Sequence, residues 1–256
     1  MTAKIVSLVN QKGGVGKTTT AVSLAAGLGQ RGQRVLLVDM DPQSNATSAV
    51  GVESRNAIGV YDTLLDEEPA ADCIVQVIDE KIWLLPASQA LAGAEVELVP
   101  ILARERRLAT ALNAVRDQYD WILIDCPPSL GLLTINALTA SDCVIIPVQC
   151  EYMALEGLSR LTETLELVRK NLNPGLFILG VVLTMWDART RLGQDVIDEV
   201  RSHFSQTFDT VIPRAVRLSE APSHRQSIFR YEPGGRSAVA YDALAGELLA
   251  RVGVAV

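Results

Sequence analysis

The sequence predicts an α/β fold in which a mostly parallel, twisted sheet is flanked by helices on both faces. Short apolar, β-branched runs alternate with segments of helical periodicity along the 256 residues. This alternation is typical of βαβ units, whose right-handed crossovers place helices against the sheet. The composition agrees, because 48% of the residues are hydrophobic and 21% are charged, close to the averages of folded globular proteins.

Six short runs rich in apolar and β-branched residues are the expected strands, a pattern typical of strands buried on both faces. They cover residues 5–9, 34–38, 82–85, 121–124, 144–148 and 177–183. Apolar positions three and four apart predict helices over residues 18–30 and 158–172. Because no linker rich in Pro, Gly or Ser interrupts the pattern, we expect one domain over residues 1–256.

Composition also excludes several classes of protein. No apolar run reaches the ~18 residues of a membrane span, and the N-terminus resembles a strand more than a signal peptide, so we expect a cytoplasmic protein. Cysteines 73, 126, 143 and 150 have neither disulfide nor zinc spacing, which predicts free buried thiols. The net charge of −7 argues against nucleic-acid binding over the whole surface but leaves room for a local basic region.

Residues 10–20 read NQKGGVGKTTT and join the first expected strand to the first expected helix. Glycines 13, 14 and 16 permit backbone angles and a close approach that a Cβ would block, so successive N–H groups can surround a phosphate. Lys17 is placed to reach the β- and γ-phosphates, and the Thr18 hydroxyl is a suitable ligand for Mg²⁺. This segment predicts a nucleoside triphosphate site at a helix N-terminus.

Three carboxylates follow expected strands. Asp39 and Asp41 end the second run, and Asp125 ends the fourth. Because ligands of an open parallel sheet bind beyond the carboxyl ends of its strands, these side chains are expected to converge on the phosphate loop. Asp125 follows four apolar residues, so it should be at least half-buried and in need of a cation such as Mg²⁺.

Four motifs resemble those of one family. Residues 12–19, KGGVGKTT, resemble the deviant Walker A motif of the ParA/MinD ATPases, which have the P-loop NTPase fold. Residues 36–43 (LLVDMDPQ) and 121–128 (WILIDCPP) resemble the Walker A′ and Walker B segments of ParA, and residues 212–223 (IPRAVRLSEAPS) are similar to a segment of the chromosomal ParA proteins called Soj. The resemblance extends from about residue 4 to residue 249.

The resemblance implies a Mg²⁺-dependent ATP hydrolase that forms a homodimer with ATP. It assigns catalysis to Lys12, Lys17 and Asp41, and Asp41 would orient or deprotonate the attacking water. Lys12 would reach across the dimer to the partner's nucleotide. That role makes physical sense, because one site has limited room for the ammonium groups of both Lys12 and Lys17. A solvated loop charge is the alternative for Lys12.

The family pattern also implies which residues bind ATP and metal. Thr18 and Asp125 would hold Mg²⁺, with Asp39 in a supporting position or as a purely structural hydrogen-bonding group. The expected ATP-binding residues are Lys12, Gly13, Gly14, Val15, Gly16, Lys17, Thr18 and Thr19 at the phosphates, and Met185, Pro213 and Arg214 at the adenine.

Three further positions carry expectations with an open alternative. Residues 128–131 are expected to sense the γ-phosphate with Gly131 as a hinge, or to form an ordinary turn before a helix. Glu151 matches a segment at the family's dimer face, or is a solvated loop charge. Asn10 is expected to contact phosphate or Mg²⁺-bound water.

Arginines gather toward the C-terminal part of the chain. Residues 211–236 hold five arginines and two glutamates, and the planar guanidinium suits phosphate. Composition alone favours ordinary surface arginines paired with nearby carboxylates. The resemblance instead implies non-specific DNA binding by the dimer through the region 184–236. The expected contacts are Arg189, Arg191, Arg217, Arg225 and Arg230.

By resemblance, the protein serves chromosome or plasmid segregation on the nucleoid, together with a ParB-type centromere-binding protein that stimulates hydrolysis. A MinD-like membrane-associated ATPase is the alternative. Against it, residues 238–252 contain one basic and two acidic residues, without the basic amphipathic signature of a membrane-surface helix. The stripe Val239, Leu244, Leu248 and Leu249 is therefore expected to pack on the domain. A metal-cluster carrier is disfavoured by the absence of a CxxC pair.

Overall fold

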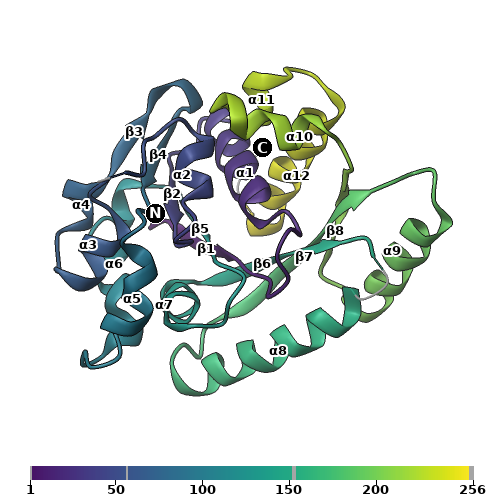
Figure 1. Cartoon of the computed structure of the whole chain (residues 1–256). Coiled ribbons are helices and arrows are strands. Elements are labelled where there is room, and N and C mark those ends of the chain that lie inside the picture. The colour runs from purple at the N-terminus through teal and green to yellow at the C-terminus, as the bar shows by residue number, and fades with distance from the viewer. Residues whose placement is uncertain (1, 56, 152–153, 254–256) are drawn as a thin grey trace.

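An eight-stranded sheet in the order β3-β4-β2-β5-β1-β6-β7-β8 forms the centre of the molecule (Figure 1). This computed structural model describes residues 2–55, 57–151 and 154–253. Every neighbouring pair is parallel except β3 with β4, which confirms the expected mostly parallel sheet. The strands are β1 (Lys4–Leu8), β2 (Val35–Asp39), β3 (Val75–Val77), β4 (Ile82–Leu85), β5 (Trp121–Asp125), β6 (Cys143–Gln149), β7 (Phe177–Trp186) and β8 (Thr207–Pro213).

The six expected strands correspond to β1, β2, β4, β5, β6 and β7; β4 has the expected ends, and the ends of the others differ by at most three residues. Two strands lack the apolar run that predicts a buried strand. β3 is a three-residue antiparallel edge strand with two exposed positions. β8 has polar residues at its centre, where its burial is lowest, and it forms the opposite edge.

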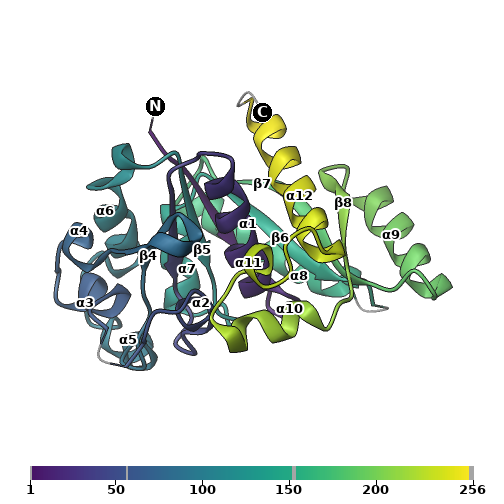
Figure 2. The same ribbon diagram turned by 90° about the horizontal axis from the view of Figure 1, so that it is seen from above.

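Helices cover both faces of the sheet, as expected (Figures 1 and 2). One face is packed by α1 (Lys17–Gln30), α2 (Asn45–Ala49), α11 (Ile228–Tyr231) and α12 (Arg236–Val252). The other is packed by α3 (Val60–Leu65), α4 (Ala70–Cys73), α5 (Leu91–Glu97), α6 (Arg107–Asn113), α7 (Leu132–Ala140), α8 (Ala154–Asn171) and α9 (Arg191–His203). The helices expected over residues 18–30 and 158–172 are α1 and α8, and α8 begins four residues earlier than expected.

The C-terminal helix packs on the sheet through most of its expected stripe. Leu244, Leu248 and Leu249 are buried against α1 and β8. Val239 is 58% exposed, so its inclusion was wrong. It lies five residues before Leu244, a spacing that turns its side chain well away from the buried face of a helix. Within the described part of the chain, no helix combines the length and apolar character that crossing a bilayer requires.

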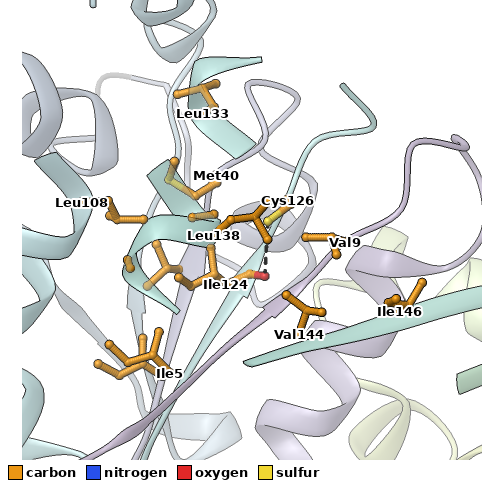
Figure 3. Packing of buried hydrophobic residues seen from close by; sticks show 14 of the residues in the cluster. Ile5, Val9, Met40, Leu108, Ile124, Cys126, Leu133, Leu138, Val144 and Ile146 are labelled. Carbon is orange, nitrogen blue, oxygen red and sulfur yellow. Dashed lines mark hydrogen bonds between the residues drawn. The ribbon is translucent and has the colours of Figure 1, made fainter. Parts of the chain in front are cut away.

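All four cysteines are free and buried, as their spacing predicts. Burial raises the pKa of the Cys150 thiol to about 11, so it stays protonated at neutral pH. Cys126 follows Asp125 and packs with Val9, Met40 and Leu133 in the core that supports the strand ends (Figure 3). These thiols therefore serve as small apolar side chains.

Candidate functional site

The strand order brings together the carboxyl ends of three neighbouring strands, β2, β5 and β1, at the centre of the sheet. β5 lies between β2 and β1, and Asp125 is in register with both Asp39 and Leu8. The two carboxylates therefore stand side by side at the point where β1 continues into the glycine-rich loop. The sequence predicted this convergence from the strand ends alone.

The loop before α1 is shaped by two glycines in the left-handed region. Gly14 has φ +75° and Gly16 has φ +88°, conformations that side chains with a Cβ rarely adopt. A Cβ at Gly13 or Gly14 would meet no other atom within 4 Å, so the space above the loop is open to a ligand. On its inner side, the Thr184 hydroxyl donates a hydrogen bond to the Val15 carbonyl at 2.9 Å and ties the loop to β7.

Lys17 is the first residue of α1 and is only 7% exposed. Its Nζ donates to the Lys12 carbonyl oxygen at 3.3 Å, so the side chain folds back over the loop. Burial lowers the pKa of Lys17, and the negative charges of Asp125 and Asp41 act in the opposite direction. The ammonium thus lies between the open loop and the carboxylates, where a phosphate would meet it.

Asp125 is fully buried, and neither of its carboxylate oxygens has a hydrogen-bond partner among the described residues. Burial, followed by the charge of Asp39, raises the pKa of Asp125 well above its ordinary value, while the nearby Thr18 hydroxyl and Lys17 oppose the rise. A buried carboxylate without partners is costly. Hard oxygen donors of this kind suit Mg²⁺, so the residues present fit the expected metal.

Asp39 is also buried, but the protein itself uses both of its oxygens. Oδ2 accepts hydrogen bonds from the Thr47 amide at 2.8 Å and the Thr47 hydroxyl at 2.7 Å, and Oδ1 accepts from the Asp41 amide at 3.2 Å. Burial raises the pKa of Asp39 to about 6, against the lowering effect of these bonds. The contacts place Asp39 in a supporting position that fixes α2 and the Asp41 loop.

Asp41 is 8% exposed and follows β2 by two residues. Its Oδ1 accepts a hydrogen bond from the Gln43 amide at 2.9 Å, which holds the carboxylate in a turn. Its negative charge acts on both Lys17 and Asp125, so the side chain belongs to the same electrostatic cluster.

Lys12 extends out of the loop and is half-exposed. Its Nζ forms an ion pair with Glu151 Oε2 at 2.7 Å, and Gln149 donates to the other oxygen of Glu151. Asn10 uses both ends of its side chain within the protein: its Oδ1 accepts from the Lys12 amide at 3.0 Å and its Nδ2 donates to the Pro147 carbonyl at 2.8 Å. Asn10 therefore anchors the loop to β6.

A cavity of about 750 Å³ opens beside the loop. It brings Thr18 and Thr19 together with Met185, Pro213 and Arg214, the residues expected around the adenine. Ile212, from the segment 212–223, also lines it, as do Val22 and Thr184, which no motif in the sequence marked. This cavity is lined by Gly16 at the end of the phosphate loop, so it is continuous with the loop, as a nucleotide site requires.

The five expected DNA-contacting arginines fall into two groups. Arg189 and Arg191 lie at the turn between β7 and α9, whereas Arg217, Arg225 and Arg230 lie around α10 (Arg217–Glu220) and α11. Arg189 forms two hydrogen bonds with Asp187, Arg217 pairs with Glu220 at 2.8 Å, and Arg230 pairs with Asp79 at 3.0 Å. Within the described residues, neither Arg191 nor Arg225 forms an ion pair.

Comparisons with known proteins agree with this geometry. A family model described as an AAA domain matches residues 3–178. The chain is 58% identical over 249 residues to the sporulation initiation inhibitor protein Soj of Bacillus subtilis, covering 96% of this chain and 98% of that protein. It is 49% identical over 250 residues to the chromosome partitioning protein ParA of Myxococcus xanthus, covering 97% and 88% respectively.

A solved structure shows the same fold with nucleotide present. Cobyrinic acid a,c-diamide synthase from Mycobacterium smegmatis, with bound ADP and magnesium, superimposes with a TM-score of 0.87 at 36% identity, covering 98% of this chain and 96% of that one. The phosphate loop, the two Walker carboxylates and these relatives lead to one conclusion: the chain belongs to the ParA/Soj family of P-loop partitioning ATPases.

Proposed function

We propose that this chain binds Mg²⁺-ATP, dimerises around it, and in that form binds DNA without sequence preference to drive chromosome or plasmid segregation. The observation that carries the proposal is Asp125, a buried carboxylate without a hydrogen-bond partner beside Lys17 and an open glycine loop. We infer that residues 1–256 form one domain, in which the region 184–236 supplies the DNA contacts.

The catalytic proposal follows from charge and position. Phosphoryl transfer depends mainly on holding the reacting groups and on neutralising the charge of the transferred group. Lys17 and the amides of the loop would bind the phosphates, and Thr18 and Asp125 would hold Mg²⁺, which supplies charge neutralisation. Asp41 would orient or deprotonate the attacking water, and Asp39 keeps Asp41 in place through the 3.2 Å bond to its amide.

The dimer proposal rests on Lys12. Its half-exposed ammonium is paired with Glu151 on the surface rather than turned into its own site. If Lys12 serves the nucleotide of a second copy, two protomers enclose two ATP molecules, and ATP stabilises the dimer. Hydrolysis then removes the γ-phosphate that both protomers contact, and the dimer loosens.

The DNA proposal follows from the dimer. A region with few unpaired arginines on a chain of charge −7 binds phosphate weakly by itself. Two such regions on one dimer multiply the number of phosphates contacted, so ATP controls DNA affinity through the oligomeric state. A ParB-type centromere-binding protein would accelerate hydrolysis and release the dimer from nearby DNA, which keeps the active form on the nucleoid.

The test measures molecular mass and DNA retention with no nucleotide, with ADP, and with a non-hydrolysable ATP analogue. We expect a dimer that retains duplex DNA only with the analogue, and Asp41→Ala with ATP should behave in the same way. A protein that stays monomeric and ignores DNA at low salt with the analogue contradicts the proposal. Pelleting with anionic vesicles in place of DNA retention would assign the MinD-like function instead.

A further inference from the structure

The N-terminus of α7 is capped by a side chain from another helix. Oε2 of Glu95, on α5, accepts a hydrogen bond from the Leu132 amide at 3.0 Å, and Oε1 lies 3.5 Å from the Leu133 amide. The cap position, Gly131, has no side chain to serve this role, and the first turn of α7 contains no carboxylate of its own. Glu95 therefore satisfies amides that would otherwise lack partners and supplies negative charge at the positive end of the helix.

This contact explains why position 131 is a glycine. Its backbone angles, φ −78° and ψ −170°, are extended and open to any residue, so neither strain nor a special turn requires glycine. A Cβ at this position would lie 2.2 Å from both carboxylate oxygens of Glu95. The glycine leaves room for the carboxylate, and the expectation that Gly131 acts as a hinge has no support in its conformation.

The capped end of α7 is joined directly to the candidate metal ligand. Only residues 126–131 separate Asp125 from the first turn of α7. At the start of this segment, the Cys126 amide donates to the Leu8 carbonyl at 3.3 Å. At its end, the Thr134 hydroxyl donates to the Ser129 carbonyl at 2.6 Å, and Glu95 holds the helix.

α5 presents Glu95 from a fixed position. Leu91 and Ala94 of this helix, and Leu98 at its C-terminal end, are fully buried in the core. Leu133 of α7 packs in the same core, near Met40 and Cys126 (Figure 3). The helices that carry the two partners of the cap are therefore both anchored in the core beneath the site.

We propose that Glu95 is a positioning residue for ATP hydrolysis: by capping α7 through the space left by Gly131, it fixes the segment that follows Asp125. The inference rests on the proposed roles of Asp125 and Mg²⁺-ATP. Glu95 lies outside every Walker motif and is not among the residues that line the cavity beside the phosphate loop.

The experiment compares Glu95→Ala, Gly131→Ala and the double variant in the full chain. Removing the cap should lower kcat for Mg²⁺-ATP roughly fivefold or more while the Kd for ATP stays within about twofold, since the binding loop is untouched. An added Cβ at position 131 should displace the carboxylate and give a similar loss. The double variant should then be no worse than Glu95→Ala, because both changes break the same contact.

Glu97→Ala is the matched control, since it removes an exposed carboxylate two residues along the same helix that accepts a hydrogen bond from Tyr61 and caps no helix. Its kcat should equal that of the unmodified protein. If the losses of Glu95→Ala and Gly131→Ala multiply in the double variant, or if kcat per folded molecule stays unchanged while only the Tm falls, the positioning role is wrong.

Amide exchange of Leu132 and Leu133 tests the cap independently of any activity. Exchange in the nucleotide-free protein should accelerate roughly tenfold in Glu95→Ala, because these amides lose their acceptor. Unchanged exchange would overturn the inference even if the protein dimerises and binds DNA as proposed. If exchange accelerates in Glu95→Ala but the unmodified protein fails to dimerise with the ATP analogue, the helix cap is confirmed and the proposed function is rejected.

Discussion

Asp39 and Asp125, at the ends of adjacent strands, differ in their hydrogen bonding because their neighbours differ. Asp39 and Asp125 are both fully buried and stand in register on neighbouring strands. Asp39 accepts three hydrogen bonds from Thr47 and Asp41, whereas Asp125 accepts none within the described chain. Their positions follow from the sequence, since each ends an apolar run. Their different hydrogen bonding does not follow from the sequence, because Thr47 on α2 contacts Asp39 only when α2 packs over the end of β2.

Lys17→Ala tests the phosphate loop at the scale of one residue. The variant removes the buried ammonium nearest the open loop, so ATP affinity should fall by far more than tenfold, equivalent to over about 1.4 kcal/mol. Lys12→Ala is the matched control, because its half-exposed ammonium faces Glu151 rather than its own site. Equilibrium binding of a fluorescent ATP analogue to the monomer measures both. An affinity within about threefold for Lys17→Ala would show that the loop does not bind phosphate as assigned.

At the scale of elements, the sequence predicts the strands, helices and loops whose own residues carry a recognisable pattern. The central strands and α1 appear as apolar runs and helical stripes, and the glycine loop between β1 and α1 carries its own motif. β3 and β8 lie at the edges and are held by neighbours, so their own residues give little signal. The Glu95 cap is not predicted for the same reason, because it joins residues 37 and 38 positions apart and neither helix alone shows it.

Glu247 links α12 to β8, and its contacts predict a pH dependence. Its oxygens accept from the Asp209 amide at 2.8 Å, the Thr210 amide at 3.0 Å and Arg251 at 2.8 Å. Although burial alone would raise the pKa of Glu247, these bonds hold it below the ordinary value. A depressed pKa contributes stability above the unfolded-state value of 4.5, and that stability disappears as the pH falls through the folded-state pKa.

Glu247→Gln should therefore lower the free energy of unfolding by about 1 kcal/mol at pH 7, or the Tm by roughly 2–4 °C. At an acidic pH below the lowered folded-state pKa, the two proteins should approach equal stability, because the native side chain is then protonated. Thermal unfolding at both pH values measures the difference. Asp242→Asn, which removes a more exposed charge from the same helix, is the control and should change the Tm less. An equal loss at both pH values would contradict the linkage.

For the molecule as a whole, the net charge argues against DNA binding over the whole surface, whereas the charge of one region favours local DNA binding. The chain is acidic overall, yet residues 211–236 carry five arginines against two glutamates. The structure adds that Arg189, Arg217 and Arg230 already hold carboxylate partners. If DNA binds this region as proposed, its phosphates would have to displace those partners, whereas Arg191 and Arg225 could bind phosphate without breaking an ion pair. These ion pairs form only in the folded chain, so the sequence does not predict which arginines already have a carboxylate partner.

Arg225→Glu should consequently weaken DNA binding by the ATP-analogue dimer more than Arg189→Glu does. Reversing an unpaired charge removes a phosphate contact from each protomer, so the slope of log Kd against log salt should fall by about 2 per dimer. Lys170→Glu, the same charge change on α8 across the sheet, is the control for net charge. Titrations of labelled duplex DNA at several salt concentrations give both quantities, with dimer mass and ATP turnover without DNA measured alongside. If Arg225→Glu and Lys170→Glu bind DNA equally, the region around α11 is an ordinary solvated surface and the DNA contacts lie elsewhere on the dimer.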